Sequence, residues 1–181
     1  MDSNSGFGSS GAPFEYTVAE AKGKALTTRK LLLILGYIIY VVVFFIIFVR
    51  INIFMVAFVL ISSIAVVWLT WKFTQIEYEY SFFAGELTVN RILGNRTRKN
   101  LMKVRIQNFS AVFAATELNQ SKIEAFAPEK TIFAASAATA ENLWVALWED
   151  AESSKHMALY FEPNEKAIKI LKYYNASAMA K

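Results

Sequence analysis

The chain has no cysteine and a single histidine, His156, among its 181 residues. Without cysteine, disulfides, thiolate metal sites and cysteine nucleophiles are all excluded. Glycine and proline are also scarce, at seven and three residues, and no G-x-x-x-x-G-K sequence is present. A phosphate-binding loop of that type is therefore absent as well. These absences leave few routes to catalysis.

Charge is missing from two long stretches, residues 31–49 and 53–71. Each is almost wholly apolar and long enough to cross the roughly 30 Å hydrocarbon core of a bilayer. A helix in a soluble core would show polar residues every 3.6 positions, and these stretches do not. Only a short segment containing Arg50 separates them. We predict a transmembrane helical hairpin within residues 30–72.

Basic residues flank this hairpin unevenly. Arg50 alone lies in the turn, whereas the outer flanks carry Lys22, Lys24, Arg29 and Lys30 on one side and Lys72 on the other. The positive-inside rule then predicts a multi-pass protein of the cell (plasma) membrane with both termini in the cytosol. Residues 1–29 are expected to be a disordered or juxtamembrane tail, because their beginning is rich in Gly and Ser and poor in apolar side chains.

From residue 73 the hydrophobic pattern changes to a period of two, which is typical of half-buried strands. It predicts strands near residues 76–82, 87–89, 102–106, 109–115, 131–133, 143–148 and 157–161. Residues 116–129 are polar and irregular, so no element is expected there. Pro163 and Asn164 then open a helix over about residues 163–175, because proline suits a first helical position and asparagine an N-cap.

About seven antiparallel strands followed by one amphipathic helix is the order of a pleckstrin-homology (PH)-like split β-barrel. An open α+β sheet with a packed helix uses the same elements and remains the alternative. The chain is thus predicted to be an α+β membrane protein, with a tail at 1–29, a two-helix hairpin at 30–72 and a cytosolic PH-like β domain at 73–181.

Four short motifs strengthen the barrel interpretation: Tyr78-Glu79-Tyr80, Gly85-Glu86-Leu87, the basic run from Arg96 to Lys103, and the sequence FEPNEK at residues 161–166. Together with the hairpin they resemble an uncharacterised family of small two-helix membrane proteins from Gram-positive, clostridia-like bacteria, whose C-terminal domain is PH-like. The resemblance covers roughly residues 30 to 175. It implies a fold but no activity, so it brings no catalytic residue with it.

The residues themselves argue against an enzyme. His156 has Ser153 and Ser154 nearby, but no orienting acid or oxyanion hole accompanies them. Glu149, Asp150 and Glu152 lack the spacing and glycine of a calcium loop. We therefore expect no catalytic residue, no metal and no cofactor.

Two groups of residues are candidates for contact with partners. The first is a basic cluster after the Gly94-Asn95 turn, formed by Arg96, Arg98, Lys99, Lys103 and Arg105. Its expected role is contact with anionic lipid headgroups or with a protein, against the alternative of a solubilising hairpin that protects a sheet edge. No aromatic residue is interleaved with it, so nucleic acid is not an expected partner.

The second group is Trp144 and Trp148, which share one face of a predicted strand. They form either an exposed aromatic patch or a surface packed under the terminal helix.

Two functions remain open. One is a membrane-anchored, non-catalytic interaction module that contacts lipid or recruits an unidentified membrane or cytosolic protein. The other is an accessory subunit whose two helices pack against other subunits of a membrane complex.

Overall fold

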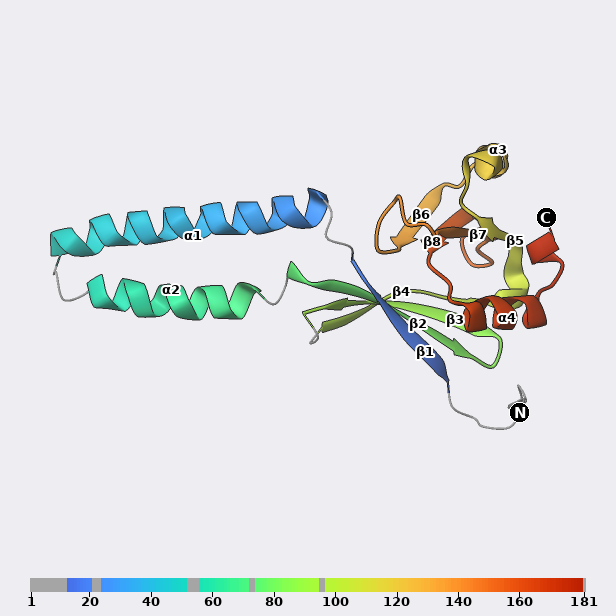
Figure 1. Ribbon diagram of the computed structural model, residues 1–181, viewed down its shortest axis with the longest axis horizontal. Helices are drawn as coiled ribbons and strands as arrows, with labels where there is room; N and C mark the ends of the chain where they lie inside the picture. The colour runs from blue at the N-terminus through green and yellow to red at the C-terminus, as the bar shows by residue number, and fades with distance from the viewer. Residues whose placement is uncertain (1–12, 21–23, 52–55, 72–73, 95–96, 181) are drawn as a thin grey trace.

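The computed structural model describes residues 13–20, 24–51, 56–71, 74–94 and 97–180. Two parts are apparent in Figure 1: a pair of helices that projects from one end, and a β domain that contains both termini of the described chain. The helices are α1 (Lys24–Ile51) and α2 (Val56–Trp71). They lie side by side and run in opposite directions.

The helix pair presents an apolar surface. No residue in the most apolar part of α1 is buried, and many of its large apolar side chains are exposed. Among the described residues, α1 is the one helix that is long and apolar enough to cross a membrane. The described part of α2 is a shorter apolar helix. Two side-chain hydrogen bonds join the helices, one between Tyr37 and Thr70 and one of 3.0 Å between Tyr40 and Ser62. They pair hydroxyl groups that would otherwise face an apolar environment.

The first sheet, sheet A, contains four antiparallel strands in the order β1-β2-β3-β4. Their bounds are Phe14–Ala19, Ile76–Phe83, Glu86–Leu93 and Thr97–Arg105. Ala84 and Gly85, both with positive φ, make the β2–β3 turn that the sequence predicted.

The first strand corrects the prediction of a disordered or juxtamembrane tail over residues 1–29. β1 pairs with β2 along its whole length, and the register runs from Phe14 opposite Phe82 to Ala19 opposite Glu77. Its inward side chains include Tyr16, whose ring stacks on Tyr80 with centroids 4.8 Å apart. The Tyr16 hydroxyl also donates a hydrogen bond of 3.1 Å to the carbonyl of Glu162. The helix pair is therefore inserted between two neighbouring strands of one sheet. Residues 1–12 lie outside the described part.

The second sheet, sheet B, has the order β5-β7-β8-β6. Its strands are Phe109–Ala114, Trp144–Glu149, His156–Phe161 and Lys130–Ala134, respectively. β6 runs parallel to β8, which corrects the prediction of a wholly antiparallel domain. A helix, α3 (Gln120–Phe126), lies in the segment predicted to be irregular. Short 3-10 turns, η3 (Ile106–Asn108), η4 (Glu117–Asn119) and η5 (Ala178–Ala180), complete the β domain.

The terminal helix, α4 (Glu165–Tyr174), is close to its predicted bounds. Asn164 is its N-cap, because its side-chain oxygen accepts a hydrogen bond of 2.8 Å from the backbone N–H of Ala167. Ala167, Ile170 and Leu171 are buried against the main core.

The two sheets pack face to face and do not close into a barrel, since no ladder joins a described strand of sheet A to one of sheet B. The structure thus has two open sheets where the sequence predicted a split β-barrel, with an open sheet as the alternative. Between them lies the main core, which includes Tyr80, Leu87, Val104, Leu159 and Phe161. A second, smaller apolar cluster lies on the other face of sheet B, where Ile123 and Phe126 of α3 cover Val145 and Leu147.

The predicted exposed aromatic patch does not form. Trp148 is only 3% exposed and packs edge-on against Phe109, with ring centroids 5.8 Å apart. Trp144 is half-buried against the main core. The prediction assumed that only one face of this strand is buried, whereas α3 covers the opposite face of β7 as well.

We predict that replacing Tyr16 weakens the β domain. Tyr16→Ala removes a stacked ring and a hydrogen bond to the Glu162 carbonyl, so the free energy of unfolding should fall by about 2 kcal/mol. Chemical denaturation in detergent micelles, followed by circular dichroism, measures the change. Thr17→Ala is the matched control, because Thr17 is exposed on the same strand. Equal stabilities of the two variants would contradict the placement of β1 in the sheet.

We also predict that Trp148 supports the core. Trp148→Ala should lower the free energy of unfolding by about 3 to 5 kcal/mol, because it leaves a cavity beside Phe109. The same denaturation experiment reports the loss, and Trp144→Ala should cost less because Trp144 is half-buried. A larger effect at Trp144 than at Trp148 would overturn this account of the strand.

Candidate membrane-facing site

The end of sheet A nearest the helices is fixed by backbone hydrogen bonds. Just before α1, the N–H of Glu20 donates to the carbonyl of Ile76, and just after α2, the carbonyl of Gln75 accepts from the N–H of Gly94. Both bonds are 2.9 Å long. The connections to both helices and the β3–β4 turn therefore lie together at one end of the sheet, which we call the helix-proximal end. Figure 1 shows that this end of sheet A projects beyond sheet B.

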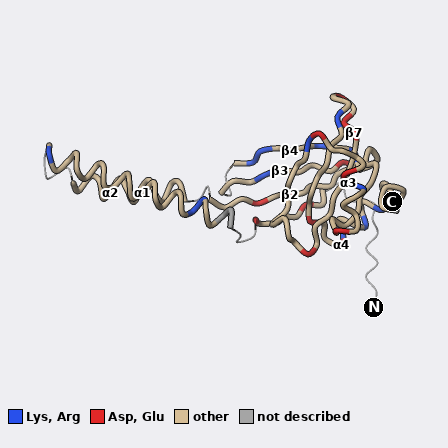
Figure 2. The backbone as a smooth tube through the Cα atoms, turned by 90° about the horizontal axis from the view of Figure 1, so that it is seen from above, with Lys and Arg blue, Asp and Glu red and all other residues tan. Residues whose placement is uncertain are grey.

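The predicted basic cluster is spread along β4 rather than gathered at this end. Arg98 and Lys99 lie near the turn, whereas Lys103 and Arg105 lie toward the opposite end. At about 3.3 Å per residue, Arg105 is some 26 Å farther along the strand than Thr97. Figure 2 shows the Lys and Arg positions distributed along β3, β4 and the start of α1. Arg96, the remaining member of the predicted cluster, lies outside the described residues.

The cations far from the helices are already paired. Lys103 lies 2.8 Å from one carboxylate oxygen of Glu86, and Arg105 lies 3.8 Å from the other. The hydrogen bond from Lys103 is the main cause that holds the pKa of Glu86 below its usual value. Lys103 and Arg105 share the outward face of β4. Their charge is largely balanced there, so they are poor candidates for an anion site.

An irregularity in the β3–β4 ladder reverses the faces of the residues that precede it on β4. Val89 is opposite Met102 and Asn90 is opposite Asn100, so Leu101 is the extra residue of a β-bulge. Past the bulge, Arg98 lies on the outward face of the sheet, where it forms a 3.1 Å ion pair with Glu79. Glu79 is only 6% exposed and also accepts a hydrogen bond from Asn90.

Lys99 lies on the opposite, inward face, directly across from Arg91 of β3. Arg91 is in turn directly across from Tyr78 of β2, so the three side chains form a row over three strands. Residues directly opposite in an antiparallel pair share a face, with Cβ atoms about 5 Å apart. Neither Arg91 nor Lys99 makes an ion pair within the described part of the chain. The buried Nε of Arg91 also has no hydrogen-bond partner there.

The start of α1 adds charge to the same end. Arg29 forms a 3.1 Å ion pair with Glu20, and the ammonium of Lys30 lies 5.7 Å from the ring centroid of Trp71. Burial raises the pKa of Tyr78 and the charge of Glu20 raises it further, while Arg91 and Arg29 lower it. The charges of Glu20 just after β1, Arg91 on β3 and Arg29 on α1 thus all act on the Tyr78 hydroxyl group. From the sequence, Glu20 and Arg91 were not named at all, and Arg29 and Tyr78 were noted only as a helix flank and as part of a motif. The pairing of β1 with β2 and of β2 with β3 is what brings the four residues together.

The residues considered for catalysis have structural partners instead. His156 donates from Nδ1 to the carbonyl of Phe126 at 2.8 Å and stacks on the Phe126 ring, which attaches α3 to β8. Asp150 accepts hydrogen bonds from the N–H and hydroxyl of Ser153 within the β7–β8 loop. Among the described residues, no three His, Asp or Glu side chains are grouped so as to hold a metal ion.

Comparison with known proteins places the chain in a family. Residues 14–181 match the family described as Bacterial PH-like domain (DUF6106). The match begins at the first residue of β1 and runs through the helix pair. Neither a curated protein nor a solved structure is significantly similar to the chain. The predicted resemblance to an uncharacterised bacterial PH-like family is confirmed, and the chain belongs to the family of bacterial PH-like domains.

Proposed function

We propose that the protein is a membrane-anchored, non-catalytic interaction module, in which α1 and α2 cross the membrane as a hairpin and sheet A stands against its inner surface. PH-like domains commonly mediate protein or lipid interactions. In this chain, the observation that carries the proposal is the insertion of the helix pair between β1 and β2. It supports an arrangement in which the end of the domain next to the helices faces the bilayer.

The helices have the length and surface that this arrangement needs. α1 has 28 residues, and at about 1.5 Å per residue it is some 42 Å long, more than the hydrocarbon core requires. The most apolar stretch of α1 has a mean hydropathy of 3.1, and none of its residues is buried within the protein. The described 16 residues of α2 span about 24 Å. The apolar sequence itself begins at residue 53.

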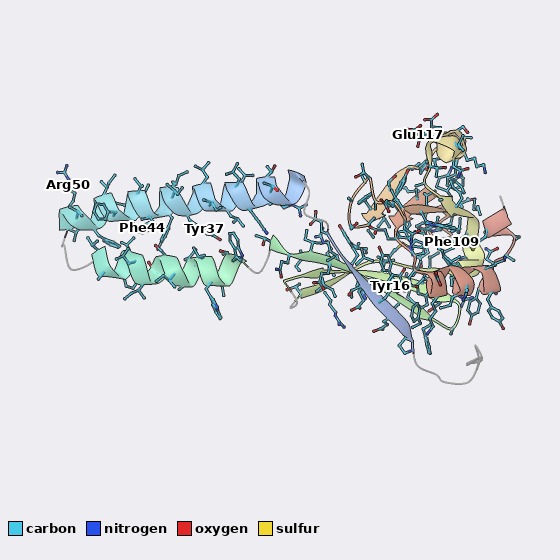
Figure 3. All side chains as sticks on the ribbon, in the orientation of Figure 1. Tyr16, Tyr37, Phe44, Arg50, Phe109 and Glu117 are labelled. Atoms are coloured by element: carbon cyan, nitrogen blue, oxygen red, sulfur yellow. The ribbon has the colours of Figure 1, made fainter. Side chains whose placement is uncertain are left out.

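Charge at the two ends of the helix pair supports a cytosolic β domain. Figure 3 shows Arg50 at the tip of α1 farthest from the β domain. At the other end, Arg29 and Lys30 precede the apolar part of α1, and Arg91, Arg98 and Lys99 lie on the adjoining strands. An excess of Lys and Arg on one side of a hairpin favours the cytosol for that side.

The same charges favour anionic lipid as a partner. Each Lys or Arg near the inner surface contributes about 1 kcal/mol of attraction to anionic lipid. Arg98 and Lys99 lie on the part of β4 nearest the helix pair; Arg98 pairs with Glu79, whereas Lys99 makes no ion pair within the described part of the chain. Lys103 and Arg105 lie toward the opposite end and pair with Glu86. The lipid-facing part of the predicted cluster is therefore its N-terminal part.

A specific observation also favours the alternative, an accessory subunit of a membrane complex. A groove on α2 is lined by Ser63, Ile64, Val67, Trp68 and Trp71. Its lining is nearly all apolar, with one small polar residue, which suits the close approach of a helix from another membrane protein. In-membrane crosslinking from Ile64, followed by identification of the attached protein, separates the two functions: crosslinks to lipid alone favour the interaction module.

We predict that the two ends of the helix pair lie on opposite sides of the membrane. Because the chain has no cysteine, a single cysteine gives an unambiguous signal. In intact cells, Ile51→Cys should react with a membrane-impermeant maleimide, and Ser153→Cys should react only after the cells are permeabilised. Labelling of Ser153→Cys in intact cells would contradict the proposed orientation, and equal labelling of both would contradict a membrane-spanning pair.

A further inference from the structure

At the helix-proximal end of sheet A, two cations face each other, and neither makes an ion pair within the described part of the chain. Arg91 and Lys99 are directly opposite on adjacent strands and share the inward face. Like charges in this position repel and destabilise an antiparallel pair. The other cations described on these two strands, Arg98, Lys103 and Arg105, each pair with a glutamate. The uncompensated pair is therefore an exception within its own sheet.

The Arg91 side chain has the unmet hydrogen-bonding capacity that an anion would satisfy. Its Nε is buried and has no partner among the described residues. A buried donor without an acceptor costs about 1 to 3 kcal/mol, and more when the group is charged. A guanidinium and an ammonium side by side offer the donors that a tetrahedral oxyanion accepts, since arginine binds phosphate through two parallel N–H groups and lysine as a point charge.

The neighbours of Arg91 and the position of this part of sheet A indicate where a bound anion would lie. Tyr78, directly across from Arg91, is only 8% exposed and presents a hydroxyl on the same face. The carboxylate of Glu20 forms its ion pair with Arg29 rather than with Arg91. This part of sheet A extends beyond sheet B and adjoins the start of α1 and the end of α2 (Figure 1). An anion bound here would therefore lie near the surface of the bilayer.

We propose that Arg91 and Lys99 form a binding site for a phosphate group at the junction between the helix pair and the β domain. In its lipid form the proposal rests on the proposed function, because the bilayer then supplies the phosphate through a lipid headgroup. A free phosphate has the same chemistry. The bulge at Leu101 creates the site, since without it Lys99 would face outward together with Lys103.

The test uses the full-length protein in neutral detergent micelles and follows its thermal unfolding. One series adds dioleoylphosphatidylglycerol, with dioleoylphosphatidylcholine as the neutral comparison. A second series adds inorganic phosphate at constant ionic strength. The variants are Arg91→Gln and Lys99→Gln, with Lys103→Gln as the matched control on the same strand. Arg98→Gln reports on lipid contact through the outward face.

The proposal predicts opposite effects of Lys99→Gln with and without ligand. Without anion the variant should be at least as stable as the wild type, because a repulsive pair is removed. With phosphatidylglycerol or phosphate it should lose most of the rise in Tm, as should Arg91→Gln, and the apparent affinity should fall about fivefold for each charge removed. Lys103→Gln should respond like the wild type. A response to phosphatidylglycerol alone identifies a lipid headgroup, and a response to inorganic phosphate as well identifies a general phosphate site.

The proposal is overturned if neither anion raises the Tm of the wild type, or if Lys103→Gln loses the response as fully as Lys99→Gln. It is also overturned if the response to phosphatidylglycerol survives in Arg91→Gln and Lys99→Gln but is lost in Arg98→Gln. In that last case lipid contact, and with it the proposed function, stands without the Arg91–Lys99 site. Failure of the maleimide labelling pattern would instead remove the membrane anchor and leave only a free-phosphate site.

Discussion

The backbone pairing of β1 with β2 is the constraint on which the rest of this structure depends. Because the two strands are paired from Phe14–Phe82 to Ala19–Glu77, the chain must leave and re-enter sheet A at adjacent points. The intervening helices are then held side by side at their base, and hydrogen bonds between Tyr37 and Thr70 and between Tyr40 and Ser62 join them farther along. The helix pair is thus an extension of the sheet, and the β domain has one defined end next to the helices.

This constraint also explains the distribution of charge on sheet A. Strand pairing brings Glu79 and Glu86 within reach of Arg98, Lys103 and Arg105, so the outward face of the sheet is lined with ion pairs. Such pairs contribute little stability at an exposed surface, but they neutralise cations far from the helices. Arg91 and Lys99, which make no ion pair within the described part of the chain, lie next to the helix pair. A lipid or phosphate contact is therefore favoured at one end of the sheet and disfavoured at the other.

Much of this arrangement follows from local sequence patterns. Alternation of apolar and polar residues correctly predicted seven of the strands, and Asn164 correctly predicted the start of α4, because these signals need only neighbouring residues. β1 was missed since its partner β2 is distant in sequence, with both helices in between. α3 was missed because its sequence is mostly polar and its apolar contacts are few. The sequence left two alternatives for Trp148, an exposed patch or burial under the terminal helix. It could not decide between them because an alternating pattern cannot show a strand buried on both sides, and α3 covers the second face of β7.

The candidate site was predicted only in part, for a similar reason. The sequence indicated a basic segment after the Gly94 turn, and Arg98 and Lys99 lie there as expected. A strict period of two would place Lys99 with Lys103, but the extra residue at the bulge reverses the faces of the residues before it. Arg91 carried no signal of its own. Its importance comes from its position opposite Lys99, which only the register of β3 and β4 reveals.

The central claim is that the helix-proximal end of sheet A rests on the membrane surface. It is tested most directly by quenching of a fluorophore by lipids whose headgroups carry a nitroxide. Thr97→Cys at the start of β4 and Gln107→Cys in η3, just after the end of β4, provide two exposed positions. Each is labelled with bimane in the full-length protein in phospholipid nanodiscs. Because these positions are separated by more than 20 Å along the strand, we expect strong quenching at position 97 and little at position 107. Equal quenching at both positions, or stronger quenching at 107, would contradict the account.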